Sequence, residues 1–175
     1  RRLLSALTGA LAALLALAWG SAQAQWTSLS DQQIKAAYVL NFVRYVDWPE
    51  RSFASADAPL SVCTFGGDAA ILAGIGGKVV KGHTVQVRAV TGADEARTCH
   101  ALFIPDQDAR RYVATLRALQ QQAVLTIGDA DGFVDVGGMV GLVHADNRLQ
   151  FEVNLGLLQQ AQLKASSQLL RLARN

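Results

Sequence analysis

Charged residues are scarce in this chain and unevenly placed. Only 17% of its 175 residues are Asp, Glu, Lys or Arg, and after Arg1 and Arg2 no charge occurs before Asp31. Within this uncharged stretch, residues 3–19 are rich in Leu and Ala and are followed by Gly20-Ser21-Ala22-Gln23-Ala24. A basic start, a short apolar run and a small-x-small end predict a secretory signal peptide. The alternative is a transmembrane anchor, because the shortest spanning helices have roughly 17–25 residues, but the Ala-Gln-Ala end favours cleavage after Ala24.

Removing residues 1–24 leaves no excess of charge of either sign. Lys and Arg fall from 16 to 14, and the 14 Asp and Glu residues are unchanged, so the expected net charge of residues 25–175 is zero. Neither a basic patch for nucleic acid nor a polybasic membrane-binding segment is indicated. We therefore expect one exported domain over residues 25–175, which is long enough to bury a sizeable core.

Cysteine is nearly absent as well. The chain has two, Cys63 and Cys99, and no C-x-x-C motif. An even count in an exported chain favours a disulfide. Such a bond would close a loop of about 36 residues and contribute about 3–4 kcal/mol in the chain-entropy model. The alternative is a pair of free thiols with a redox or metal-binding role.

Hydrophobic periodicity alternates between the helical and the strand type along the chain. A helix is predicted over residues 31–46, with Ile34, Tyr38, Phe42 and Tyr45 as its apolar stripe. Further segments are predicted as strands at 59–65, 79–90, 99–104 and 124–127, helices at 68–75 and from 106 or 108 to 122, a hairpin at 139–144 and 148–153, and short helices at 155–162 and 166–173. This order predicts a single three-layer α/β domain: a mostly parallel central sheet, an antiparallel C-terminal hairpin and flanking helices.

Motifs for catalysis, cofactors or metals are missing. The glycines between Gly66 and Gly82 lack the spacing of a dinucleotide or Walker loop. Asp129, Asp131 and Asp135 lack the late Glu of a calcium loop, and the three histidines have no metal-like spacing. No G-x-S-x-G is present. The sequence therefore predicts no enzyme, no cofactor and no metal site.

Two groups of residues are candidates for a partner or ligand surface. In the second strand of the hairpin, Leu149, Phe151 and Val153 face one side. Arg148, Gln150, Glu152 and Asn154 face the other, as a polar row that is either an ordinary wet face or a binding surface. The second group consists of aromatic anchor candidates at the N-terminal helix, whose stripe core packing explains equally well: Tyr38, Phe42, Tyr45 and Trp48.

Several segments together resemble the YfiR family of periplasmic proteins. They are residues 35–49 (KAAYVLNFVRYVDWP), 99–104 (CHALFI), 125–133 (LTIGDADGF), 137–139 (GGM), 148–155 (RLQFEVNL) and 163–173 (LKASSQLLRLA). The resemblance rests on their number and order and extends over essentially all of residues 25–175.

The resemblance implies a periplasmic repressor of an inner-membrane diguanylate cyclase, which lowers cyclic di-GMP and biofilm formation. It implies that the protein binds the periplasmic region of that cyclase, that an outer-membrane lipoprotein sequesters it, and that it is a homodimer with an α/β fold. It also implies that Cys63 and Cys99 form one of the family's disulfides. A second cysteine pair of some relatives is absent from this chain.

A periplasmic small-molecule-binding module is the alternative function. It is suggested by the glycine-rich strand ends of an α/β sheet, where ligands commonly bind. The two functions are compatible if a ligand modulates the repressor.

Overall fold

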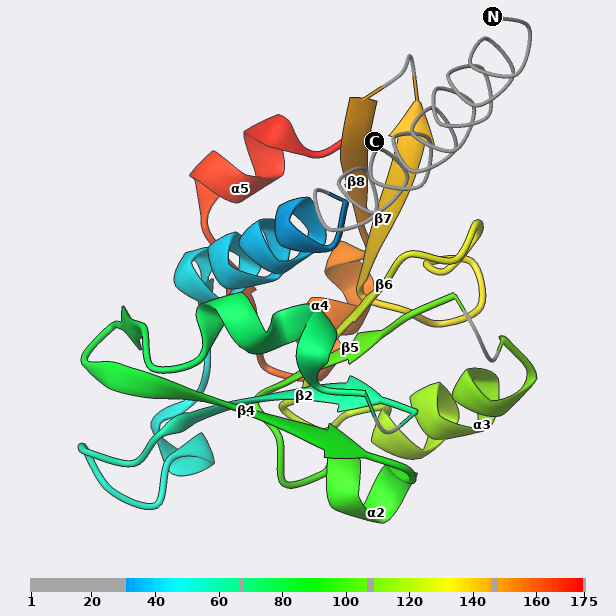
Figure 1. Cartoon of the computed structure of the whole chain (residues 1–175). Helices are drawn as coiled ribbons and strands as arrows, with labels where there is room; N and C mark the ends of the chain where they lie inside the picture. Colours follow the sequence, from blue (N-terminus) through cyan, green and yellow to red (C-terminus); the bar gives the residue numbers. More distant parts are fainter. Residues whose placement is uncertain (1–30, 67, 107–108, 146–147, 175) are drawn as a thin grey trace, which may run out of the picture.

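The computed structural model describes residues 31–66, 68–106, 109–145 and 148–174, which form a seven-stranded sheet with helices on both faces and a small two-stranded sheet (Figure 1). The strands are β1 (Val46–Asp47), β2 (Leu60–Phe65), β3 (Val79–Val80), β4 (His83–Val90), β5 (Ala101–Ile104), β6 (Leu125–Gly128), β7 (Val140–Ala145), β8 (Arg148–Val153) and β9 (Lys164–Ala165). The helical segments are the N-terminal helix (helical from residue 31 to 45), η1 (Glu50–Ser52), η2 (Ala70–Ile75), α2 (Ala93–Ala96), α3 (Ala109–Leu119), α4 (Leu155–Gln160) and α5 (Ser167–Leu172).

The large sheet has the strand order β3-β4-β2-β5-β6-β7-β8. Strands β4, β2, β5, β6 and β7 are parallel, and β8 returns antiparallel to β7 with Val140 opposite Val153. The predicted mostly parallel sheet with an antiparallel C-terminal hairpin is therefore confirmed. The chain moves outward from β2 to β4 and then back to β5 on the other side of β2, which makes the β2–β5 boundary the switch point of this doubly wound sheet.

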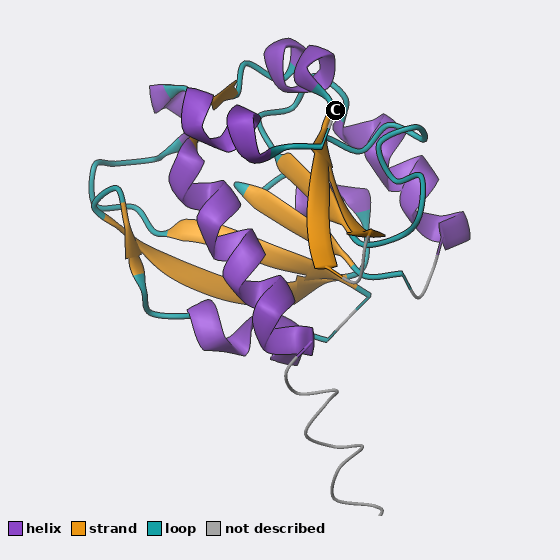
Figure 2. Ribbon diagram, turned by 90° about the horizontal axis from the view of Figure 1, so that it is seen from above, coloured by secondary structure: helices purple, strands orange, loops and turns teal. Residues whose placement is uncertain are grey.

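Two hydrophobic cores confirm the three layers. On one face the N-terminal helix, η2, α4 and α5 pack against the sheet, with Phe42 and Phe103 fully buried. On the other face α2 and α3 cover a smaller core that contains Cys63, Cys99 and Phe133. Figure 2 shows helices on both sides of the strands.

The buried face of the N-terminal helix differs from the predicted stripe. Its core residues are Ala36, Val39, Leu40, Phe42 and Val43. Ile34 and Tyr45 are exposed, and Tyr38 is half-buried. The predicted stripe was right for Phe42 and wrong for Ile34 and Tyr45, because most positions from 36 to 46 are apolar, so that periodicity does not define one arc. The aliphatic residues take the centre, and the tyrosines lie at the rim.

Residues 79–90 form a hairpin where one strand was predicted. Strands β3 and β4 pair antiparallel, with Val80 opposite His83. The two residues between them, Lys81 and Gly82, both have positive φ (51° and 86°). Positive φ at both central residues is the geometry of a tight two-residue hairpin turn, which a Lys-Gly pair signals only weakly. Strand β9, which pairs with β1, was not predicted.

Candidate functional site

A cavity of about 650 Å³ lies between the segment that follows the N-terminal helix and the segment at the end of α4 and the start of β9. Its lining comes from Asp47, Trp48, Pro49, Glu50 and Arg51 on one side and Gln159, Gln162, Leu163 and Lys164 on the other. Pairing of β1 with β9 holds these segments together, and the Ser166 amide donates to the Tyr45 carbonyl at 2.8 Å. The volume lies in the range of small-molecule sites, about 300–1,000 Å³.

A second cavity, of about 470 Å³, separates the N-terminal helix from η2. It is mostly apolar, with Gln32, Gln33 and Lys78 as its polar residues and Ala36, Ala37, Leu40, Ala70, Ile71, Gly74 and Ile75 as the remainder. It borders the crossover that leaves β2 at its carboxyl end. Both cavities are therefore candidate ligand sites near the edges of the parallel sheet.

Two histidine rings enclose a phenyl ring beside the first cavity. Phe53 stacks on His83 with ring centroids 4.0 Å apart and on His100 at 4.3 Å. Nδ1 of His83 lies 2.6 Å from the Ala58 carbonyl oxygen, and Nε2 of His100 lies 3.0 Å from the Ser52 carbonyl oxygen. The two imidazoles thus fasten the connection between β1 and β2 to the body of the domain.

The hydrogen bonds of His100 require a neutral ring. The Ser61 amide donates to Nδ1 at 3.0 Å, so that nitrogen accepts, and Nε2 must carry the hydrogen that reaches Ser52. Burial, together with the nearby His83 ring, lowers the pKa of His100, against the opposing effect of its hydrogen bond to Ser52. This histidine is a satisfied, nearly buried group (9% exposed).

A charged cluster lies at the carboxyl end of β6. Nζ of Lys35 lies 2.8 Å from Asp129 and 2.9 Å from Asp31, and the Asp106 amide donates to Asp129 at 2.7 Å. Burial alone would lower the pKa of Lys35, but the hydrogen bonds to Asp129 and Asp31 outweigh it and raise the pKa. The cluster fixes the N-terminal helix to the sheet, and its one ammonium and two carboxylates carry a formal net charge of −1.

The disulfide prediction is confirmed. Cys63 in β2 and Cys99, just before β5, are bonded, with their Cα atoms 6.1 Å apart. Both side chains are buried beneath α2 and α3. Nη2 of Arg88 lies 3.6 Å from Sγ of Cys99 and also donates to the Thr98 hydroxyl.

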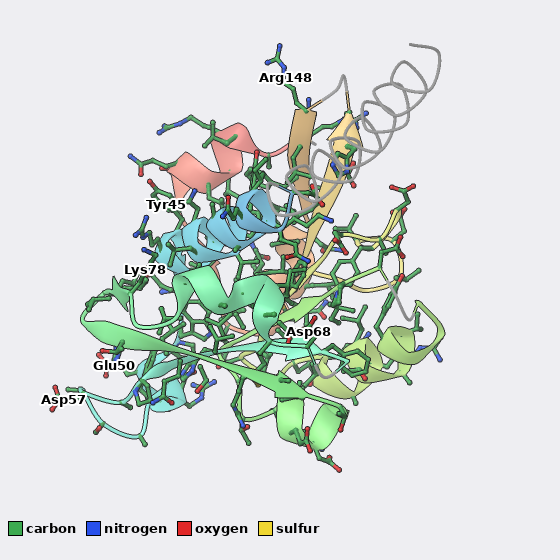
Figure 3. The ribbon with its side chains drawn as sticks, viewed as in Figure 1. Tyr45, Glu50, Asp57, Asp68, Lys78 and Arg148 are labelled. Atoms are coloured by element: carbon green, nitrogen blue, oxygen red, sulfur yellow. A yellow bond between two sulfur atoms is a disulfide. The ribbon has the colours of Figure 1, made fainter. Side chains whose placement is uncertain are left out.

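The polar row of the hairpin lies on β8 as predicted. Arg148 is exposed at the free end of the hairpin (Figure 3), and Gln150 and Glu152 are half-buried. The Asn154 side chain accepts a hydrogen bond from the Leu157 amide at 3.1 Å, so it caps α4. Glu152 and Asn154 also line an open hollow of about 430 Å³. Of the row, Asn154 has a clear structural role.

The four aromatic candidates have different environments in the structure. Tyr38 and Phe42 pack against Phe151, and the Tyr38 hydroxyl donates to the Leu149 carbonyl at 2.7 Å. Tyr45 is exposed (37%). Trp48 lines the larger cavity and donates from Nε1 to the His100 carbonyl at 3.0 Å. These aromatics and the polar row therefore do not form one surface: Tyr38 and Phe42 contact the apolar face of β8.

Sequence reasoning missed the residues that form the larger cavity opposite Trp48. Gln159, Gln162 and Lys164 come from the end of α4 and from β9, whose pairing with β1 spans more than a hundred residues. Positive φ at Gln162 (60°) reverses the chain there. No local pattern signals this turn, since the residue is neither Gly nor Asn.

Within the part of the chain that the structure describes, no group of three or more His, Cys, Asp or Glu side chains is placed to hold a metal ion. The same residues leave no buried side-chain nitrogen or oxygen without a hydrogen-bond partner. No helix among them is both long and apolar enough to span a bilayer.

The comparisons with known proteins give one family. A family described as YfiR/HmsC-like matches residues 32–174. No curated protein matches the chain. One similar solved structure, titled as the ABC domain in complex with L-Trp from Streptococcus pneumonia, has a TM-score of 0.45 and 13% identity, with 65% of this chain covered. The chain spans about half of that one (53%). A likeness this distant carries no argument about ligands.

Proposed function

The chain belongs to the YfiR/HmsC-like family, and from that premise we propose that it represses an inner-membrane diguanylate cyclase from the periplasm. The family is periplasmic, regulatory rather than catalytic, and part of cyclic di-GMP signalling. The observation that carries the proposal is the extent of the match, which includes every element of the described domain. Residues 1–24 lie outside the described residues, and their cleavage as a signal peptide is part of the proposal.

Repression by binding requires only a difference in affinity. A protein that binds the inactive form of the cyclase more tightly than the active form shifts the population toward the inactive form. The output domain in the cytoplasm then produces less cyclic di-GMP. No catalytic group in the repressor takes part in this scheme.

The test combines binding with output. The periplasmic region of the cyclase, carrying an affinity tag, should retain the purified protein, and deletion of the gene should raise cyclic di-GMP and biofilm. Replacing Arg148, Gln150 and Glu152 together by Ala tests the polar row, with Arg117→Ala as an exposed control on α3. Absence of retention, combined with unchanged cyclic di-GMP in a strain whose cyclase is active, would overturn the proposal.

Further parts of the proposal follow the family. We first expect a homodimer, which sedimentation of the purified protein measures directly. We also expect a lipoprotein of the outer membrane that competes with the cyclase for binding to this protein. A monomer at micromolar concentration would contradict the first expectation. Retention of the cyclase region unaffected by the lipoprotein would contradict the second.

The two cavities, of about 650 and 470 Å³, favour a small-molecule-binding role as a second candidate function. A ligand that binds the folded state raises its melting temperature. A panel of amino acids and nucleotides should then include a compound that shifts the transition of the wild type but not of a Trp48→Ala variant. A flat response across the panel would contradict this second function.

A further inference from the structure

The outer edge of β4 is paired over only the first part of its length (Figure 1). Strand β3 covers His83 and Thr84, and Val85 exchanges hydrogen bonds with Lys78 (2.8 Å) and Gly77 (2.9 Å). The Val90 carbonyl instead accepts from Gly66, on the side of β2. Backbone groups alternate in direction along a strand, so those of Val87 and Ala89 point outward, as those of Val85 do. Among the described residues nothing is hydrogen-bonded to these outward groups.

The other end of the sheet is protected in a way that this edge is not. On β8 the Leu149 carbonyl accepts from the Tyr38 hydroxyl, and the Phe151 carbonyl accepts from the Arg174 amide. On β4 there is no proline, and its register with β2 is continuous from Val85 to Val90, without a bulge. Proteins usually block exposed edges with prolines, bulges or covering groups, because an open edge pairs with other chains.

The segment that forms this edge carries charges of one sign. Residues 76–90 contain Lys78, Lys81 and Arg88 and no Asp or Glu. Lys81 is paired with Asp47, whereas Lys78 and Arg88 make no ion pair with any described residue. The carboxylates that follow the strand are engaged elsewhere: Asp94 with the Arg97 guanidinium, and Glu95 with the Thr91 amide.

We propose that the outer edge of β4 at Val87 and Ala89 binds an extended, acidic segment of a partner protein as an added strand. Backbone hydrogen bonds would supply the pairing, and alternate side chains of the segment would supply the specificity. Carboxylates in the segment complement Arg88 and Lys78. A second copy of β4 is the wrong partner, because antiparallel pairing about this region brings two arginines together and like charges across strands destabilise.

The test uses the protein purified from the periplasm and an acetylated, amidated hexapeptide, Thr-Val-Glu-Val-Glu-Thr, as the probe. We expect the peptide to slow hydrogen exchange of the Val87 and Ala89 amides at least fivefold and to leave the Leu149 amide unchanged. A peptide with Lys in place of Glu should bind at least fivefold more weakly. Ala89→Pro, which removes one outward N–H at a position where edge strands tolerate proline, should weaken binding at least tenfold, whereas Ala89→Thr should not.

Three results would overturn the proposal: no protection at Val87 and Ala89 in the wild type, equal binding of the two peptides, or protection that rises with protein concentration without peptide. The last would identify a second copy as the occupant. The wild-type exchange measurement decides the matter even if Ala89→Pro does not fold. The outcome is independent of whether the cyclase is the partner.

Discussion

At the scale of single residues, hydrogen bonds hold the buried ring of His100 in its neutral form. One ring nitrogen accepts from the Ser61 amide, and the other donates to the Ser52 carbonyl. The sequence could not show the stack of His100 with Phe53, which depends on the fold of the connection between β1 and β2.

Acid should destabilise the protein through His100. The pKa of this ring is lowered in the folded state, whereas the unfolded value is about 6.5. The unfolded chain therefore takes up a proton that the folded chain refuses, so the stability present above about pH 6.5 is lost as the pH falls from there toward the folded pKa. Burial is the largest cause of the lowered pKa, the nearby His83 also opposes protonation, and the hydrogen bond to Ser52 acts in the other direction.

Urea unfolding between pH 7.5 and 5 measures this effect. His100→Gln should unfold more easily at pH 7.5, by about 1–3 kcal/mol because buried hydrogen-bond partners lose their geometry, and should lose less stability on acidification than the wild type. His144→Gln is the matched control, since His144 is exposed on β7. An unchanged pH slope in His100→Gln would contradict the assignment.

The ion pair between Lys35 and Asp129 should be costly to break from one side. The Asp129 side chain is 7% exposed, and without Lys35 its carboxylate keeps, among the described residues, only the Asp106 amide. Lys35→Ala should reduce the free energy of unfolding by about 3 kcal/mol, as expected for an unpaired buried charge. Lys78→Ala should change it by less than about 0.5 kcal/mol. Equal stability of the two variants would contradict this, and Lys35→Met with Asp129→Asn should recover part of the loss.

At the scale of elements, sequence periodicity located the strands and helices better than it identified their faces. Alternation in β8 correctly separated Phe151 from the polar row, because a strand with period two has only two faces. The N-terminal helix is apolar on more than one face, so its sequence does not determine which face is buried. Packing against the sheet determines it. The pairing of β1 with β9 was invisible because each strand has only two residues.

Packing explains Gly138 better than backbone freedom does. Gly137 does have a positive φ (107°), but a Cβ on Gly138 would lie 2.1 Å from the buried Phe133 ring. Gly138→Ala should therefore cost about 1–3 kcal/mol from overpacking. Gly74→Ala, where a Cβ meets nothing within 4 Å, should cost none of this. Thermal unfolding of the two variants compares them, and equal melting temperatures would contradict the packing role.

The disulfide joins β2 to the start of β5 across the switch point of the sheet. Cys63→Ser should reduce stability by a few kcal/mol, and the double variant Cys63→Ala, Cys99→Ala by about 3–4 kcal/mol, because the unfolded chain regains the freedom of a loop of about 36 residues. Reductant should lower the melting temperature of the wild type and leave the double variant unchanged. A wild type indifferent to reductant would argue against a stabilising bond.

At the scale of the whole molecule, the charge distribution was the most informative property of the sequence. The uncharged N-terminal stretch predicted export, and the neutral remainder argued against nucleic acid as a partner. The three-layer architecture followed from the order of the elements. The cavities did not, since each is formed by segments far apart in the chain.

Repression of a cyclase by binding also sets how much more tightly the protein must bind the inactive cyclase than the active one. If the protein lowers the active population of the cyclase about 100-fold, its affinity for the inactive form must exceed that for the active form by at least about 100-fold. The dissociation constant should therefore rise by that factor for a full-length cyclase in detergent that is cross-linked in its active state, relative to one cross-linked in its inactive state. Each cyclase with its cross-link reduced is the control for the substitutions that introduce the cross-link. The two reduced cyclases should bind the protein with the same dissociation constant. Equal dissociation constants for the two locked forms would rule out repression by population shift, because a ligand with equal affinity for both states shifts neither.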